Sequence, residues 1–350
     1  MGESKPEMKG TKPTTNQSSV KEILIIMVMH ICKKSIFFDT NLKVALYLGS
    51  LFLISLIADF FAIPKGYLAR SDNLLNQYFV KFAWGWNLLL LVPYTMLTSF
   101  VYCCGDKEKI VKQHAIRIII ATLFWWIWTT SFDLIESTFG RCSMKGELYN
   151  AKRKCLKDGY YWNGLDISGH CFILVYGSLV LIEETRSIIN WDSIKDSIRL
   201  EDHQRITKSN AENTNILKNL SPQQFQILKF SYEKFTPYIR GIFIGITLLQ
   251  ILWDVMLVGT MVYHHIMIEK FLGGSVAILT WFFTYRFWYT SPKFLPRLPA
   301  EGIFRYNKPK SPPLVTRKRT GSIINGQPTF MGRPLRTETA TSDNKEEIAR

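Results

Sequence analysis

Six apolar segments of about 20 residues dominate this chain of 350 residues. The hydrocarbon core of a bilayer, about 30 Å thick, is crossed by a helix of about 20 apolar residues. Segments this long and this poor in charge favour membrane helices over the buried strands of a soluble sheet. We therefore predict an all-α, polytopic membrane protein whose six transmembrane helices lie at Val44–Ile63, Phe82–Cys103, Ala115–Ile135, Ser168–Ile189, Ile239–Tyr263 and Phe271–Tyr289.

The remainder of the chain is polar, since a hydrophobic content of 47% goes with a mean hydropathy of only +0.04. We predict a polar N-terminal tail over 1–42, a six-helix membrane domain over 43–295 and a disordered, basic C-terminal tail over 296–350. Within the first tail, Ile23–Ile31 is too short to span a bilayer and lacks the cleavage site of a signal peptide. It is either an interfacial helix or the start of the first span.

The chain is basic, with 43 Lys and Arg against 28 Asp and Glu and a net charge of +15. No basic helix stripe and no zinc-finger spacing accompanies this excess, so we expect no nucleic-acid partner. Most of the basic residues lie in the two tails, in the loop 105–114 and before the fifth span, and the positive-inside rule then places both termini in the cytosol. The third loop, 136–167, is also basic and departs from this rule.

Two of the six cysteines, Cys142 and Cys155, lie apart from the others in that third loop. If the loop faces an oxidising lumen, the pair is a candidate disulfide, and two free thiols are the alternative. The other four cysteines lie in or beside spans, where cysteine behaves as a small apolar residue.

Two histidines mark one face of the membrane. His170 begins the fourth span and His265 follows the end of the fifth. Because consecutive spans are antiparallel, both side chains are expected at the same face. Imidazoles titrate near neutral pH, so one could attack phosphorus while the other protonates the leaving oxygen. Either histidine alone would more often be an ordinary interfacial side chain, but their neighbours favour a site.

The residues before the first histidine, Ser168-Gly169-His170, resemble the Ser-Gly-His element of lipid phosphate phosphatases, in which small residues let the backbone approach a phosphate and the histidine acts as an acid. Asp166 lies just ahead of this element and is a further candidate. We expect no metal here, because no Cys/His spacing pattern accompanies the two histidines.

The residues after the second histidine, from His265 to Glu269, resemble the His-x-x-x-Asp element of the same enzymes. Residues four apart share one face of a helix, so Glu269 would orient the His265 ring, whereas His264 has Ile268 at that spacing. The Ser-Arg expected near the end of the fifth span is absent. The candidate replacements that would bind phosphate are Lys270, Lys157 and Arg153.

Longer motifs resemble the fat storage-inducing transmembrane (FIT) family. The signature of its fourth membrane helix is similar to Gly169-His170-Cys171-Phe172-Ile173-Leu174-Val175-Tyr176, which continues to Glu183-Glu184. Further similar stretches are Trp162–Ser168, Asn76–Trp84, Val262–His265 and Trp281–Tyr289. The resemblance runs from about Leu42 to Pro299 and includes the Cys142/Cys155 pair.

The resemblance implies an endoplasmic reticulum membrane enzyme related to lipid phosphate phosphatases. Such an enzyme cleaves fatty acyl-CoA to acyl-4′-phosphopantetheine and adenosine 3′,5′-bisphosphate without a cofactor, and supports lipid droplet formation and endoplasmic reticulum membrane homeostasis. His170 and His265 would be the catalytic pair on the lumenal face. The alternative is a non-catalytic protein that binds diacylglycerol and triacylglycerol and partitions neutral lipid into droplets, for which the histidines need not matter.

Overall fold

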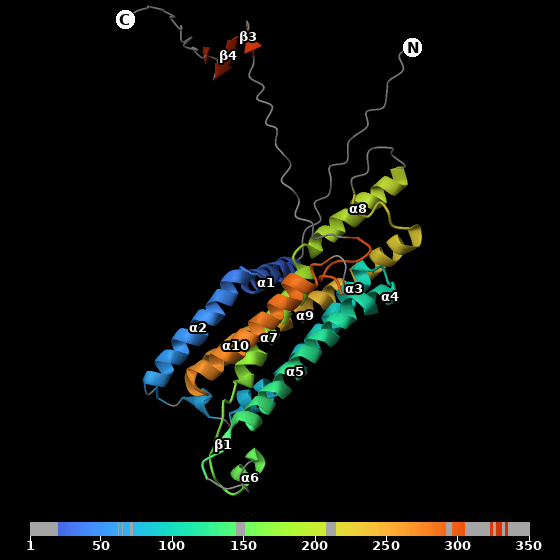
Figure 1. Cartoon of the computed structure of the whole chain (residues 1–350). Helices are drawn as coiled ribbons and strands as arrows, with labels where there is room; N and C mark the ends of the chain where they lie inside the picture. The colour runs from blue at the N-terminus through green and yellow to red at the C-terminus, as the bar shows by residue number, and fades with distance from the viewer. Residues whose placement is uncertain are drawn as a thin grey trace, which may run out of the picture. The chain divides into compact units, whose positions relative to one another are not determined.

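The computed structural model describes residues 20–61, 63–64, 66–70, 73–144, 151–207, 215–291 and 296–304, and three short strands beyond them. The α-helices shown in Figure 1 are α1 (Val20–Ile36), α2 (Thr40–Phe60), α3 (Ala83–Tyr102), α4 (Lys107–Lys109), α5 (Ile116–Phe139), α6 (Lys152–Lys157), α7 (Gly169–Glu184), α8 (Trp191–Thr207), α9 (Pro222–Tyr263) and α10 (Met267–Trp281). Short helical turns extend or join these helices. Two are 3₁₀ turns, η1 (Tyr67–Ala69) and η5 (Thr185–Ile188), and three are π-helical, η2 (Leu75–Val80), η3 (Ile110–Ala115) and η6 (Phe282–Trp288).

The strands are short. β1 (Arg141–Cys142) and β2 (Trp162–Asn163) form an antiparallel pair in the third loop. A separate unit of the chain contains β3 (Ile323–Ile324), β4 (Gln327–Phe330) and β5 (Arg333–Pro334), which form an antiparallel sheet in sequence order. Apart from the two-residue pair in its third loop, the membrane domain is helical, in agreement with the predicted all-α class.

Among the described residues, four helices are long and apolar enough to cross a membrane: α2, the helix Lys107–Phe139, α9, and the helix Met267–Trp288. The other two predicted spans are also helical, as α3 and α7, but α7 has only 16 residues. Six spans therefore remain our prediction, while four candidates are established by length and composition.

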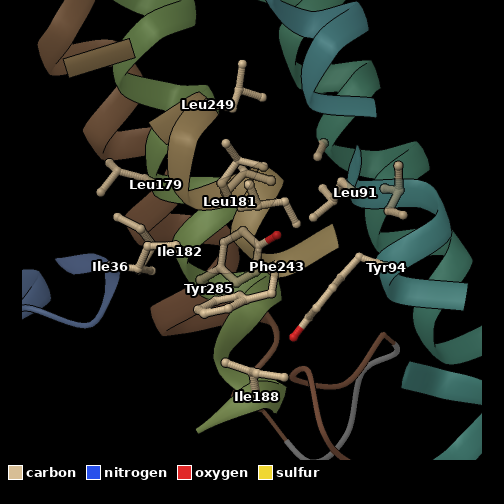
Figure 2. Close-up of a cluster of buried hydrophobic side chains, with 14 of the residues drawn as sticks. Ile36, Leu91, Tyr94, Leu179, Leu181, Ile182, Ile188, Phe243, Leu249 and Tyr285 are labelled. Atoms are coloured by element: carbon tan, nitrogen blue, oxygen red, sulfur yellow. The ribbon is translucent and has the colours of Figure 1, made fainter. Parts of the chain in front are cut away.

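The central helix is α7, which packs against α10, α9 and α3. Its side chains are buried from Cys171 through Glu184. A helix that is apolar on all sides is one enclosed by other helices. Figure 2 shows this core, in which Leu179, Leu181 and Ile182 of α7 lie among Leu91 and Tyr94 of α3 and Phe243 and Leu249 of α9.

The longest helix, α9, has 42 residues. At 1.5 Å per residue it is about 63 Å long, roughly twice the hydrocarbon thickness of a bilayer. It begins in a capping box, in which Ser221 Oγ accepts the Gln224 N–H at 3.2 Å and Gln224 Oε1 accepts the Ser221 N–H at 3.1 Å. The predicted span Ile239–Tyr263 is thus only the second part of one continuous helix, and its first part packs against α8 through the 3.1 Å hydrogen bond from Trp191 Nε1 to Thr236 Oγ1.

Part of each predicted tail is described by the structure. In the first, α1 is a helix of its own, since the chain turns after Ile36 and Asp39 caps α2 by accepting the Asn41 N–H at 3.0 Å. In the second, packing continues past the predicted boundary, because Ala300 and Phe304 are buried. The predictions for 1–19, and for 305–350 apart from the three strands, lie outside the described residues.

The third loop folds back on the end of α5. The structure joins Cys142 and Cys155 in a disulfide, with Cα atoms 5.9 Å apart. Trp162 Nε1 donates to the Glu136 carbonyl at 3.0 Å, and Lys152 Nζ lies 2.5 Å from Glu136 Oε2. These bonds place α6 beside the last turns of α5.

Candidate functional site

The two histidines lie in one pocket of about 400 Å³. The pocket lies where α5 and α9 end and α7 and α10 begin, and Figure 1 shows these helix ends at one end of the bundle. The expectation that antiparallel spans would bring them to one face agrees with this geometry. Side chains from the ends of these helices and from the segment before α3 line the pocket: Val80, Lys81, Trp125, Thr129, Phe132, Asp133, Asp166, Ile167, Gly169, His170, Ile173 and His265.

The start of α7 is fixed by its own cap and by α10. Ser168 Oγ accepts the Cys171 N–H at 3.3 Å, and the Ser168 N–H donates to the Glu269 carbonyl at 3.2 Å. A Cβ atom at Gly273 would lie 2.5 Å from the Ser168 carbonyl oxygen, so only glycine permits this approach. Ser168 is therefore a buried structural residue, while Gly169 and His170 face the pocket.

His265 lies in the turn between α9 and α10, not on a helix. Its φ of +59° is in the left-handed region, which costs a non-glycine residue about 1–2 kcal/mol. The helical spacing used to predict contact between His265 and Glu269 is therefore wrong, but the contact itself is present: His265 Nδ1 lies 3.3 Å from Glu269 Oε2. The turn, and not a helix, brings the His265 ring to the Glu269 carboxylate.

A second carboxylate, Asp166 Oδ2, lies 3.5 Å from the same His265 nitrogen. Carboxylates on one side of an imidazole favour a proton on the nitrogen that faces them. The other nitrogen, Nε2, then keeps its lone pair. This is the state that a nucleophilic histidine requires.

Glu269 also ties the site together. Its Oε1 accepts the Asp166 N–H at 3.2 Å and its Oε2 accepts the Ile266 N–H at 3.4 Å. One buried carboxylate thus joins the segment before α7 to the turn that contains His265.

The neighbouring His264 is placed differently. Its N–H donates to the Thr260 carbonyl at 3.2 Å at the end of α9, and its side chain does not line the pocket. Burial and the neighbouring His265 lower the pKa of the His264 ring. The two adjacent histidines therefore occupy distinct environments.

The profile described as "Fat storage-inducing transmembrane protein" matches residues 64–285. The chain belongs to the FIT family. It is a multi-pass membrane protein of a family linked to fat storage.

Several curated FIT proteins resemble it. The chain is 55% identical over 302 residues to "Acyl-coenzyme A diphosphatase FITM2" of Drosophila melanogaster, covering 86% of this chain and 71% of that protein. It is 32% identical over 259 residues to the Xenopus tropicalis protein of the same name (73% and 84%), and 29% identical over 254 residues to the Homo sapiens protein (71% and 82%). No solved structure matches.

In this FIT protein, Lys270, a predicted phosphate-binding residue, contacts other groups than the histidines. Lys270 is 1% exposed, its Nζ donates to the Met261 carbonyl at 2.7 Å and lies 3.7 Å from Asp59 Oδ1, and it does not line the pocket. Lys157 and Arg153, the other two candidates, lie on α6 outside this pocket. The structure therefore separates all three from the histidines.

Lys81 is the cationic side chain among the described residues that line the histidine pocket, and reasoning from the sequence missed it as a candidate. A usable signal was present. With six alternating spans, the start of the second span lies on the same face as the start of the fourth, so topology alone places Lys81 and His170 at one membrane face. Among the described residues, no group of three or more His, Cys, Asp and Glu side chains could hold a metal ion.

Proposed function

We propose that this FIT protein hydrolyses the diphosphate of fatty acyl-CoA, giving acyl-4′-phosphopantetheine and adenosine 3′,5′-bisphosphate. The observation that carries this proposal is the pocket of about 400 Å³ in which His170 and His265 meet, with two carboxylates on Nδ1 of His265. The names of the curated relatives, which are acyl-coenzyme A diphosphatases, support the same substrate.

In the proposed reaction, His265 Nε2 attacks the phosphorus on the pantetheine side of the diphosphate. The P–O bond to the other phosphate breaks, adenosine 3′,5′-bisphosphate leaves, and His170 supplies a proton to the leaving oxygen. Water then attacks the phosphohistidine, releasing acyl-4′-phosphopantetheine, and its proton returns to His170. Lys81 would offset the negative charge of the phosphates.

The position of the pocket suits a substrate with a charged head and a long apolar chain. Trp125 and Phe132 of α5 and Ile173 of α7 supply apolar surface to the pocket. An acyl chain can lie along these helices while the diphosphate stays at the wet interface. Diacylglycerol and triacylglycerol are proposed lipid partners on the same grounds, and lipid droplet formation in the endoplasmic reticulum is the proposed setting.

An assay in detergent tests the reaction. The purified full chain, given oleoyl-CoA in water enriched in ¹⁸O, should release adenosine 3′,5′-bisphosphate without label and acyl-4′-phosphopantetheine with one labelled oxygen. Label in the adenosine product would move the attack to the other phosphorus. Absence of both products, from protein that restores lipid droplets in deficient cells, would favour the lipid-binding alternative.

For the topology, we propose six spans with both termini in the cytosol and both histidines in the lumen. The excess of basic residues in the tails supports this orientation. Protease added to intact microsomes should therefore remove a tag from either terminus. A protected C-terminal tag would reverse the orientation, although the two histidines would still share one face.

A further inference from the structure

A second hollow, of about 940 Å³, lies beside the histidine pocket, and residues of the last turns of α5 and of α6 line it. Asp133 lines both the hollow and the pocket, so the two adjoin along α5. Adjacent residues on this helix line the two spaces: Thr129 lines the pocket of the histidines and Thr130 lines the hollow beside α6. A molecule bound in the pocket could therefore continue into the hollow.

The wall that α6 contributes is held in place. Cys155, on α6, is buried and bonded to Cys142 on β1. Lys152 lies 2.5 Å from Glu136 on α5, so its charge is already paired. The next residue, Arg153, is exposed and lines the hollow, and no carboxylate of the described residues forms an ion pair with it. Within the described part of the chain, the hollow thus presents a guanidinium without a carboxylate partner on an anchored helix.

The remaining walls include apolar surface. Leu134 on α5 and Leu156 on α6 are 64% and 51% exposed and line the hollow with Arg153. A flat, weakly polar ring could cover these leucines while an attached anion contacts the guanidinium. Arg binds phosphate through two parallel hydrogen bonds, which makes it the preferred side chain for this group.

Coenzyme A has both features next to its diphosphate. The ribose that bears the 3′-phosphate and the adenine is bonded directly to the diphosphate through its 5′ oxygen. With the diphosphate between the histidines, this nucleoside must occupy space that adjoins the pocket. The hollow adjoins the pocket at Asp133 and provides that space.

We propose that the hollow between α5 and α6 binds the 3′-phosphoadenosine end of the substrate, and that Arg153 recognises the 3′-phosphate. This inference rests on the proposed function and adds to it the group that distinguishes acyl-CoA from other lipid diphosphates. A phosphate on a lipid headgroup has the same chemistry, so the test separates the two sources.

The experiment compares oleoyl-CoA with oleoyl-3′-dephospho-CoA, using the full chain in uncharged detergent. Wild-type protein should cleave oleoyl-CoA with about 10-fold higher kcat/KM, mostly through a lower KM, as expected for one charge-assisted contact. Arg153→Gln should lose this preference while its cleavage of the dephospho substrate stays the same. Lys154→Gln removes the same charge from α6 outside the hollow and should keep the preference.

Each other outcome is decisive. Equal use of both substrates by wild-type protein, with Arg153→Gln unchanged, would overturn the subsite and leave the diphosphatase intact. An Arg153→Gln defect that affects both substrates equally would assign Arg153 to the fold. A defect that is absent in uncharged detergent and appears only in vesicles containing anionic lipid would assign it to the membrane surface. If wild-type protein cleaves neither substrate, the proposed function fails, and calorimetric binding of adenosine 3′,5′-bisphosphate to wild type and Arg153→Gln still decides what the hollow binds.

Discussion

Replacing His265 with alanine is expected to lower the rate of oleoyl-CoA cleavage by at least about 10⁴-fold, because the residue would be the nucleophile. The thermal unfolding temperature in detergent should change little, since the side chain lies in a turn at the rim of a pocket. The position has φ of +59°, which asparagine adopts more readily than alanine. His265→Asn should therefore be as inactive while placing even less strain on the turn.

The adjacent histidine is the matched control. His264→Ala removes the same side chain from the next residue, which does not line the pocket, and should keep most of the activity. His170→Ala should lie between the two, with a loss of about 10²- to 10⁴-fold, the usual contribution of a general acid. Full cleavage by His265→Ala would exclude the mechanism. If that variant also restored lipid droplets in deficient cells, neutral-lipid binding would become the better account.

Replacing Arg117 with methionine is expected to destabilise the protein by about 3–5 kcal/mol, the usual result of breaking a buried ion pair. The Arg117 and Glu184 side chains are 0% and 1% exposed and are joined by two hydrogen bonds, of 2.8 and 2.7 Å. Tyr285 donates a further hydrogen bond of 2.8 Å to the same carboxylate. The variant would leave the Glu184 carboxyl buried without its cationic partner, and tryptophan fluorescence on heating should show unfolding at a temperature lower by roughly 5–15 °C.

A less buried ion pair provides the control, because Glu183, which precedes Glu184 on α7, pairs with Arg286 of η6. Arg286 lies 3.3 Å from Glu183 and is 34% exposed, so Arg286→Met should cost about 1 kcal/mol or less. The double variant Arg117→Met with Glu184→Leu removes both buried charges and should recover part of the lost stability. Unfolding of Arg117→Met at the wild-type temperature would show that the pair contributes nothing to the folded state.

How far the sequence specifies this fold depends on the kind of signal. The helices and the shared face of His170 and His265 follow from the length of the apolar segments and from the alternation of spans. The helical boundaries do not, because the first part of α9 is polar and its length depends on packing against α8. The burial of α7 by other helices cannot be predicted from the sequence either, because an apolar helix has the same composition whether lipid or protein surrounds it.

The site shows the same division. The nearness of Glu269 to His265 was predicted from helical spacing, yet a turn with positive φ produces it. Arg117 lies inside the predicted third span, where the average hydropathy of the segment gives no sign of its role. An arginine in a span indicates a buried partner, which the structure identifies as Glu184. Lys270 was a reasonable choice by position, and only the folded chain reveals that its Nζ is bonded to the Met261 carbonyl.

Since α7 bears His170 at one end and Glu184 at the other, substitutions on this single helix should fall into two groups that different measurements detect. Changes near Gly169 and His170 should leave the amount of protein in the cell unchanged and lower the turnover of each molecule. Changes near Glu184 should lower the amount of protein, while the molecules that do fold should cleave the substrate at the normal rate. An immunoblot read beside an activity assay would therefore assign an uncharacterised variant of this helix to one end or the other.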